Sequence, residues 1–111
     1  MRDTVRDLWN ADAVVLCVIV HSGAVVIYIA PPYRGARYIA AQTGGDTLNT
    51  PDAAEGLHEM IHRLRSRYSL YYALPPGRAG EERKIRVQLV SSAARRYPRA
   101  VIRARTGYVA P

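Results

Sequence analysis

The sequence has no phenylalanine, one cysteine and one lysine, and each of these scarcities limits what the chain can be. Its eight tyrosines and one tryptophan are the only aromatic residues, so every aromatic side chain carries a polar group that needs water or a partner. Cys17 alone cannot form an intrachain disulfide, and its apolar neighbours suit a small hydrophobic role. Residues 1–12 carry charges of both signs and no apolar core, so no signal peptide is predicted, and the compartment is left open.

Several motifs that would indicate catalysis or nucleotide binding are missing. No Gly-x-Ser-x-Gly motif marks a nucleophile, and the sequence places no base beside Cys17. Gly44-Gly45 is too short for a phosphate-binding loop and lacks the Lys-Ser/Thr pair that follows one. We therefore expect a non-enzymatic protein with no cofactor, apart from one alternative that a histidine-containing motif raises.

Length and composition predict one small globular domain with a basic surface. The chain has 111 residues, and 49% of them are apolar, which argues against intrinsic disorder. The net charge is +7, and Lys84 is the only lysine among the 16 Lys and Arg residues. The arginines do not form a single run of five or six, and such a distribution arises from GC-rich codon usage more often than from a nucleic-acid-binding face. Nucleic-acid binding stays an alternative.

The first third of the chain predicts a helix followed by an apolar stretch. Residues 3–11 have helical apolar spacing, with Asp3 or Thr4 as the cap. Residues 13–30 carry no charged side chain, and the length of this stretch is at the lower limit for a transmembrane helix. Two buried strands separated by His21-Ser22-Gly23 are the favoured interpretation, because Val and Ile dominate and the polar triplet would be costly in lipid.

The middle of the chain predicts two further helices around a short extended segment. Residues 34–43 form the first helix, which Gly44-Gly45 ends, and residues 46–48 are extended. The second helix starts with Thr50 as N-cap and Pro51 in its first position. Its expected apolar stripe consists of Ala53, Leu57, Met60, Ile61 and Leu64.

The last third predicts strands, because the apolar period changes from helical to two. The expected strands cover residues 68–74, 83–90 and 100–106, with a Pro/Gly-rich loop at 75–80. Together they would form a three-stranded antiparallel unit with a basic outer face. The chain then divides into an α/β region over residues 1–67 and a β tail over residues 68–111, packed as one compact unit.

One motif points to an enzyme. The segment His58-Glu59-Met60-Ile61-His62 matches the His-Glu-x-x-His pattern of zinc peptidases, in which two imidazoles one turn apart bind zinc and the glutamate acts as general base. No third ligand follows at a suitable place, since position 68 is Tyr68 and Glu81 and Glu82 lie in or next to a Pro/Gly loop. A solvated helix face is the favoured interpretation, and a small zinc metallopeptidase is the alternative.

Five segments of the C-terminal two thirds of the chain carry a resemblance to a known family. They are 40–45 (Ala-Ala-Gln-Thr-Gly-Gly), 52–54 (Asp-Ala-Ala), 64–72 (Leu-Arg-Ser-Arg-Tyr-Ser-Leu-Tyr-Tyr), 83–87 (Arg-Lys-Ile-Arg-Val) and 103–111 (Arg-Ala-Arg-Thr-Gly-Tyr-Val-Ala-Pro). In order and spacing they resemble the last part of bacterial von Willebrand factor A-related proteins. The resemblance covers most of residues 36–111, and the ending Arg-Ala-Arg-x-Gly-Tyr is its most specific part.

The resemblance implies a partial α/β sheet with flanking helices, followed by a β tail, and an adhesion or protein-binding role in a family that is usually exported. The family's metal-dependent adhesion site needs an Asp-x-Ser-x-Ser loop, which this chain lacks, so no metal-site residue is carried over. The front of the parent fold would then be missing. That loss would leave the strand at residues 14–20 with an open apolar edge, so we expect either a protein partner or self-association through it.

Overall fold

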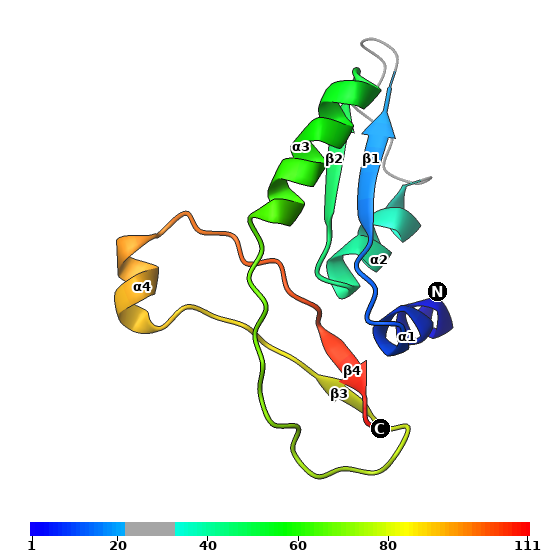
Figure 1. The fold of residues 1–111 in the computed structure, drawn as a ribbon, viewed down its shortest axis with the longest axis vertical. Coiled ribbons are helices and arrows are strands. Elements are labelled where there is room, and N and C mark those ends of the chain that lie inside the picture. Colours follow the sequence, from blue (N-terminus) through cyan, green and yellow to red (C-terminus); the bar gives the residue numbers. More distant parts are fainter. Residues whose placement is uncertain (22–32) are drawn as a thin grey trace.

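The computed structural model describes residues 1–21 and 33–111, and within them the chain is a mixed α/β protein. Four helices and two small sheets occur in this part of the chain (Figure 1). In chain order the elements are α1 (Arg2–Asn10), β1 (Leu16–Val20), α2 (Arg34–Gln42), β2 (Asp46–Thr50), α3 (Ala53–Arg65), β3 (Glu82–Lys84), α4 (Ser91–Arg96) and β4 (Gly107–Val109).

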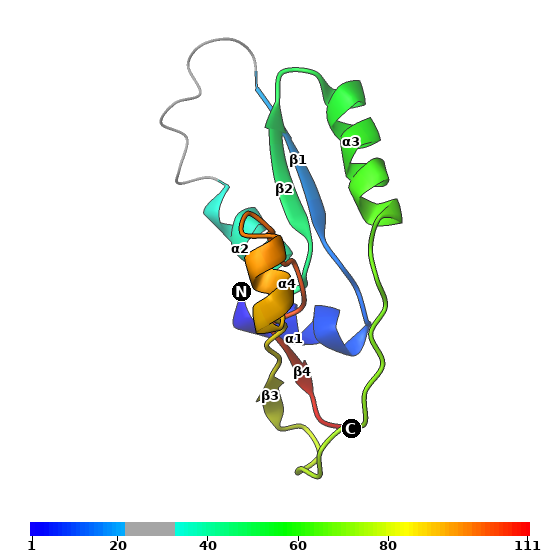
Figure 2. The same ribbon diagram turned by 90° about the vertical axis from the view of Figure 1, so that its left-hand side faces the viewer.

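The first sheet is a parallel pair that is covered by a helix on each face. Strands β1 and β2 pair in register from Leu16 with Asp46 to Val20 with Thr50. Helices α2 and α3 lie on opposite sides of this pair (Figure 2). Parallel neighbours need a long crossover connection, and α2 is part of the connection between β1 and β2.

The strand interpretation of the apolar stretch is confirmed for its first half, since Leu16–Val20 is a strand. The second apolar run, residues 24–30, and the Pro31-Pro32 pair lie outside the described residues. Among the helices in residues 1–21 and 33–111, none has the length and hydropathy needed to span a bilayer.

Helix α1 occupies nearly the predicted range, but its expected cap is wrong. Met1 is the N-cap, and no side chain caps the helix. Asp3 instead lies inside the first turn, where its charge favours the positive end of the helix dipole.

Helix α3 begins two residues later than the sequence predicts, because Asp52 is the cap and Thr50 is not. Asp52 Oδ1 accepts hydrogen bonds from the N–H groups of Ala54 (3.0 Å) and Glu55 (3.1 Å). Thr50 Oγ1 accepts the Asp52 N–H at 3.1 Å instead, which fixes the turn before the helix. Both Thr50 and Asp52 are residue types that satisfy free backbone groups, and tertiary packing decided between them.

The predicted apolar stripe of α3 is confirmed at Met60 and wrong at Leu57, Ile61 and Leu64, since the buried face of the helix runs along Gly56 and Met60. Leu57 is 57% exposed and Ile61 is 41% exposed. A Cβ atom at Gly56 would stand 2.6 Å from Thr50 Cγ2, so only glycine lets the helix backbone approach the sheet this closely. The helix rotates to bring this small residue inward, and the larger apolar side chains turn outward.

The predicted stop after α2 is confirmed, and it depends on both glycines. Gly44 has φ of +76°, a left-handed conformation that glycine adopts without strain. A Cβ atom at Gly45 would lie 1.7 Å from the Val15 carbonyl oxygen. The chain therefore turns from α2 into β2 in direct contact with the backbone that leads into β1.

The predicted three-stranded tail is wrong in the described structure, which has a two-stranded antiparallel sheet of β3 and β4. Residues 68–74 form no strand, and residues 100–106 make only the isolated bridge between Thr43 and Arg105. The helix α4 lies between two of the expected strands, where the sequence predicts no helix. Residues 67–75 make no backbone hydrogen bond to any described residue, so their period-two pattern has no ladder to join.

The chain is more extended than a globular domain of its size. Its radius of gyration is 16.3 Å, whereas a compact chain of this length has a radius of about 13 Å. The loop between α3 and β3 and the segment bearing α4 extend away from the helix-covered sheet (Figure 1). The buried apolar residues of the described chain are Val5, Ile19, Ala40, Met60 and Ala110.

Candidate functional site

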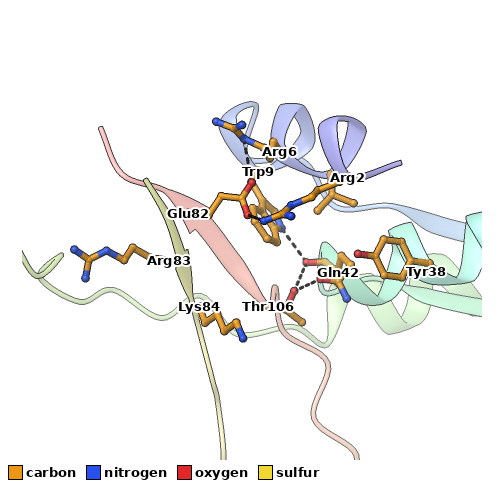
Figure 3. A pocket seen from close by; sticks show the side chains of 10 residues that line it. Arg2, Arg6, Trp9, Tyr38, Gln42, Glu82, Arg83, Lys84 and Thr106 are labelled. Atoms are coloured by element: carbon orange, nitrogen blue, oxygen red, sulfur yellow. Dashed lines mark hydrogen bonds and ion pairs between the residues drawn. The ribbon is translucent and has the colours of Figure 1, made fainter. Parts of the chain in front are cut away.

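A cavity with converging polar side chains lies where α1, α2 and β3 meet, and we call it the Trp9 cavity (Figure 3). Its volume is about 510 Å³, which is within the range of small-ligand sites. It is lined by Arg2, Val5, Arg6 and Trp9 from α1, Tyr38 and Gln42 from α2, Glu82, Arg83 and Lys84 from β3, and Thr106.

Trp9 is fixed in this cavity from two sides. Its indole Nε1 donates a hydrogen bond to the Gln42 carbonyl oxygen at 2.9 Å. The far edge of the ring lies against Gly107 of β4, where a Cβ atom would be 2.6 Å from Trp9 Cη2. Because Gly107 has no side chain, the indole can lie directly against the strand and present apolar surface to the cavity.

Charged groups surround this apolar surface with an excess of positive charge. Glu82 accepts a hydrogen bond from Arg2 at 2.9 Å and lies 3.3 Å from Arg6 Nε. The hydrogen bond from Arg2, with the charges of Arg2 and Arg6, holds the pKa of Glu82 below its usual value. Arg83 points to the other side of β3 (Figure 3), where it bonds the Pro76 carbonyl oxygen and Glu81.

Lys84 completes the cavity wall, and its side-chain ammonium group makes no ion pair or hydrogen bond within residues 1–21 and 33–111. Thr106 Oγ1 donates a hydrogen bond to Gln42 Oε1 at 2.5 Å. This bond uses the amide oxygen of Gln42, so its side-chain N–H groups can still donate to another acceptor. The wall thus combines three cations, one already paired anion and unused donors. This composition suits an anionic ligand with an apolar part.

Asp46 of β2 joins the tail to the α/β region, because it contacts one arginine of α3 and one arginine of the tail. This carboxylate is 12% exposed and contacts Arg63 (2.5 Å) and Arg103 (3.0 Å). Its own neighbour, the Thr47 N–H, donates to it at 2.9 Å. Burial alone raises the pKa of Asp46, but the hydrogen bonds and arginine charges outweigh burial and hold the pKa below its usual value.

The zinc-peptidase motif lies on the outer side of α3. His58 and His62 are both exposed, and Glu59 accepts a hydrogen bond from Arg63 at 2.8 Å. That hydrogen bond lowers the pKa of Glu59. In the described parts of the chain, no group of three His, Cys, Asp or Glu side chains is arranged to hold a metal ion. The peptidase alternative stays a prediction, which a zinc measurement with a His58→Ala control would test.

His21 and Cys17 lie at the end of β1 and within it, and neither belongs to a group of three potential metal ligands among the described residues. His21 follows β1, and its backbone N–H donates to the Thr50 carbonyl oxygen at 3.2 Å. Cys17 lies within β1, with its Sγ 3.8 Å from the Ala36 carbonyl oxygen. Both residues therefore belong to the packing of the parallel pair.

Residues 68–74, which we call the aromatic arm, expose the side chains that were expected in a sheet. Tyr68 is 93% exposed, Leu70 71% and Tyr71 95%. In the described residues, eleven of the 18 exposed large hydrophobic side chains lie between residues 68 and 102. Residues 68–74 form no strand, so their tyrosines make no cross-strand pairs in the described structure, and the Arg96 guanidinium lies 5.6 Å from the centre of the Tyr97 ring.

The Trp9 cavity was not found from the sequence, although two signals were available. Arg2 and Arg6 are spaced by one helical turn, and Glu82 and Lys84 alternate on one face of a strand. Nothing in the sequence placed α1 beside β3, because about 75 residues separate the two elements. The site is therefore a product of tertiary contact.

Comparisons with known proteins add no relative to this description. No protein-family model, no curated protein and no solved structure matches the chain.

Proposed function

We propose that this chain is a non-enzymatic protein-interaction module whose tail, residues 68–111, binds an acidic, extended segment of a partner protein. The observation behind the proposal is the large surface of the chain, to which the tail contributes eleven of the 18 exposed large hydrophobic side chains of the described residues. The chain has 8809 Å² of accessible surface, whereas a folded monomer of 12.3 kDa has roughly 6,100 Å². The excess of roughly 2,700 Å² exceeds what one partner contributes to a standard interface, about 800 Å².

The chemistry of this surface favours an acidic partner. Residues 68–111 contain nine Arg and Lys residues but only Glu81 and Glu82 as acids. Residues 1–67 contain seven basic and seven acidic residues, so the net positive charge of the chain lies in the tail. The positive charge of the tail would attract an acidic segment over several ångströms, and only two acidic side chains of the tail would repel it.

The aromatic arm supplies the extended backbone for such binding. Seven extended residues span about 23 Å, and their N–H and C=O groups have no backbone partner in the described structure. A partner strand can pair with such a segment and cover alternate side chains such as Leu70 and Tyr72. The resemblance to von Willebrand factor A-related proteins, which are binding proteins, supports the same role, with the metal-dependent adhesion site absent.

A second copy of the chain is the competing occupant, as expected from the open edge of β1. In the described residues β1 pairs only with β2, and Val14 and Val20 at its ends are 44% and 48% exposed. The net charge of +7 opposes self-association because like charges repel. Light scattering over a range of concentration separates the two occupants.

Selection from a displayed library of random peptides tests the proposal. The arm variant carries Tyr68→Ser, Leu70→Ser and Tyr71→Ser, and the control variant carries Leu57→Ser, Ile61→Ser and Leu64→Ser on the exposed side of α3. All six side chains are exposed, so both variants should unfold within about 1 kcal/mol of the natural chain. The natural chain and the control should enrich extended acidic peptides, and the arm variant should enrich them much more weakly because it has lost the side chains that a paired strand would cover. Equal enrichment of the same peptides by the arm variant would refute the proposal.

A further inference from the structure

The Trp9 cavity has features of a recognition site, although it lies apart from the aromatic arm. It joins an apolar floor of Val5 and Trp9 to cations on its wall. Val5 is 3% exposed, so the floor is part of the protein core and does not depend on a flexible side chain. A ligand that enters would displace water from the indole face and gain free energy from its own apolar burial.

The electrostatics of the cavity select the charge of that ligand. Arg2, Arg6 and Lys84 carry three positive charges, and Glu82 is the only acid in the wall. Glu82 is already occupied by Arg2 and Arg6, whose guanidinium groups it holds in place at 2.9 and 3.3 Å. A bound cation would meet a net repulsion, whereas an anion would meet Lys84, which has no partner within the described structure.

We propose that the Trp9 cavity binds a carboxylate of an acidic peptide, with Lys84 as its cation and Trp9 as the surface for the neighbouring apolar side chain. The inference rests on the proposed function, since it names the group on the partner that is recognised. The cavity adjoins β3, so a peptide that follows the tail can place an acidic residue there. The amide N–H groups of Gln42 are close enough to the wall to donate a second hydrogen bond.

The cavity contains its own probe, because Trp9 is the only tryptophan of the chain. Its fluorescence can be followed while the natural chain is titrated with acetyl-Leu-Asp-Leu-amide. We expect a saturable change, and the same peptide with Asn in place of Asp should bind about tenfold more weakly, because a charge-assisted hydrogen bond is lost. Inorganic phosphate and adenosine monophosphate serve as the phosphate-bearing competitors and should bind more weakly than the Asp peptide.

Two variants separate the site from a general effect of charge. Lys84→Gln should weaken binding of the Asp peptide about tenfold, whereas Arg99→Gln makes the same change in net charge on an exposed turn and should leave it unchanged. An unaltered fluorescence spectrum of Lys84→Gln without peptide shows that Trp9 has kept its surroundings. Equal binding of the Asp and Asn peptides, no effect of Lys84→Gln, an equal effect of Arg99→Gln, or tighter binding of a phosphate compound would each overturn the inference.

The outcome is distinguishable from failure of the proposed function. The arm variant keeps every residue of the Trp9 cavity, so it should bind the Asp peptide as the natural chain does. If peptide selection fails while this fluorescence titration succeeds, the site stands and the interaction surface of the arm is refuted. If selection succeeds while the titration shows no saturable change, the interaction module stands and the carboxylate site is refuted.

Discussion

Replacement of Asp46 by asparagine should destabilise the fold far more than the loss of an exposed charge, because this carboxylate joins three parts of the chain. It is 12% exposed and contacts Arg63 from α3, Arg103 from the last segment and the Thr47 N–H of its own strand. Asparagine keeps the shape and one acceptor oxygen, so the change removes the negative charge and leaves two arginines with a weaker partner.

The size of the expected loss in stability depends on how far Asp46 and its two arginine partners are shielded from solvent. A hydrogen bond to a charged group is worth about 1.5–3 kcal/mol when it is well protected. The side chains of Arg63 and Arg103 are 37% and 45% exposed, so solvent screens them and each contact contributes near or below the lower limit. We therefore expect Asp46→Asn to lower the free energy of unfolding by about 2 kcal/mol, which corresponds to a fall in Tm of about 8 °C.

The effect should depend on pH with a defined sign. The pKa of Asp46 is lowered in the folded chain, so its contribution is present above the pKa of an unfolded aspartate, about 3.9, and is lost as pH falls through the folded value. Urea unfolding at neutral pH should show the full difference between Asp46→Asn and the natural chain. Below about pH 4 the two unfolding curves should converge.

Asp7→Asn is the matched control, because Asp7 is exposed and its carboxylate has no ion pair within the described residues. It should change the free energy of unfolding by less than about 0.5 kcal/mol. The reasoning is refuted if Asp46→Asn costs no more than this control, or if its cost is the same at pH 7 and pH 3.

Two further predictions concern the local structure around β2. Asp52→Ala should lower the free energy of unfolding, measured in urea, by about 1 kcal/mol, because it removes the cap of α3. If Thr50→Ala instead lowered the free energy of unfolding more and removed more helix signal in circular dichroism, the cap would be misassigned. Gly45→Ala should cost more than about 4 kcal/mol, since its Cβ atom would lie 1.7 Å from the Val15 carbonyl oxygen. Gly80→Ala meets no atom within 4 Å and should cost only about 1–2 kcal/mol for its φ of +78°, so a similar loss at both glycines would contradict the steric argument.

Helices and their ends were predictable where short-range chemistry decides them. Val5, Leu8 and Trp9 have helical spacing in α1, and Gly44-Gly45 ends α2 as expected. The α3 cap was misplaced by two residues because Thr50 and Asp52 both have the chemistry of a cap. The Gly56–Met60 face was missed because a glycine that permits close approach has no signal in an apolar pattern.

The strands of the tail could not be predicted in the same way, since a period of two describes a face and names no partner. Residues 68–74 and 83–90 both alternate, yet only Glu82–Lys84 finds a strand to pair with, at Gly107–Val109. Strand pairing depends on which distant segments meet. Contacts such as the ion pair of Arg105 with Asp12 position the segment leading into β4 beside the chain that precedes β1. The Trp9 cavity has the same origin, because its walls come from opposite ends of the chain.

The sequence by itself determined the α/β class, the positions of three helices, the strand at Leu16–Val20 and the concentration of positive charge in the second half, because all of these depend on residue type and local spacing. Tertiary structure alone decided which face of α3 is buried, which tail residues pair and which cations face Trp9. These features depend on steric fit and charge contact between segments far apart in the chain, and no local pattern records those distances.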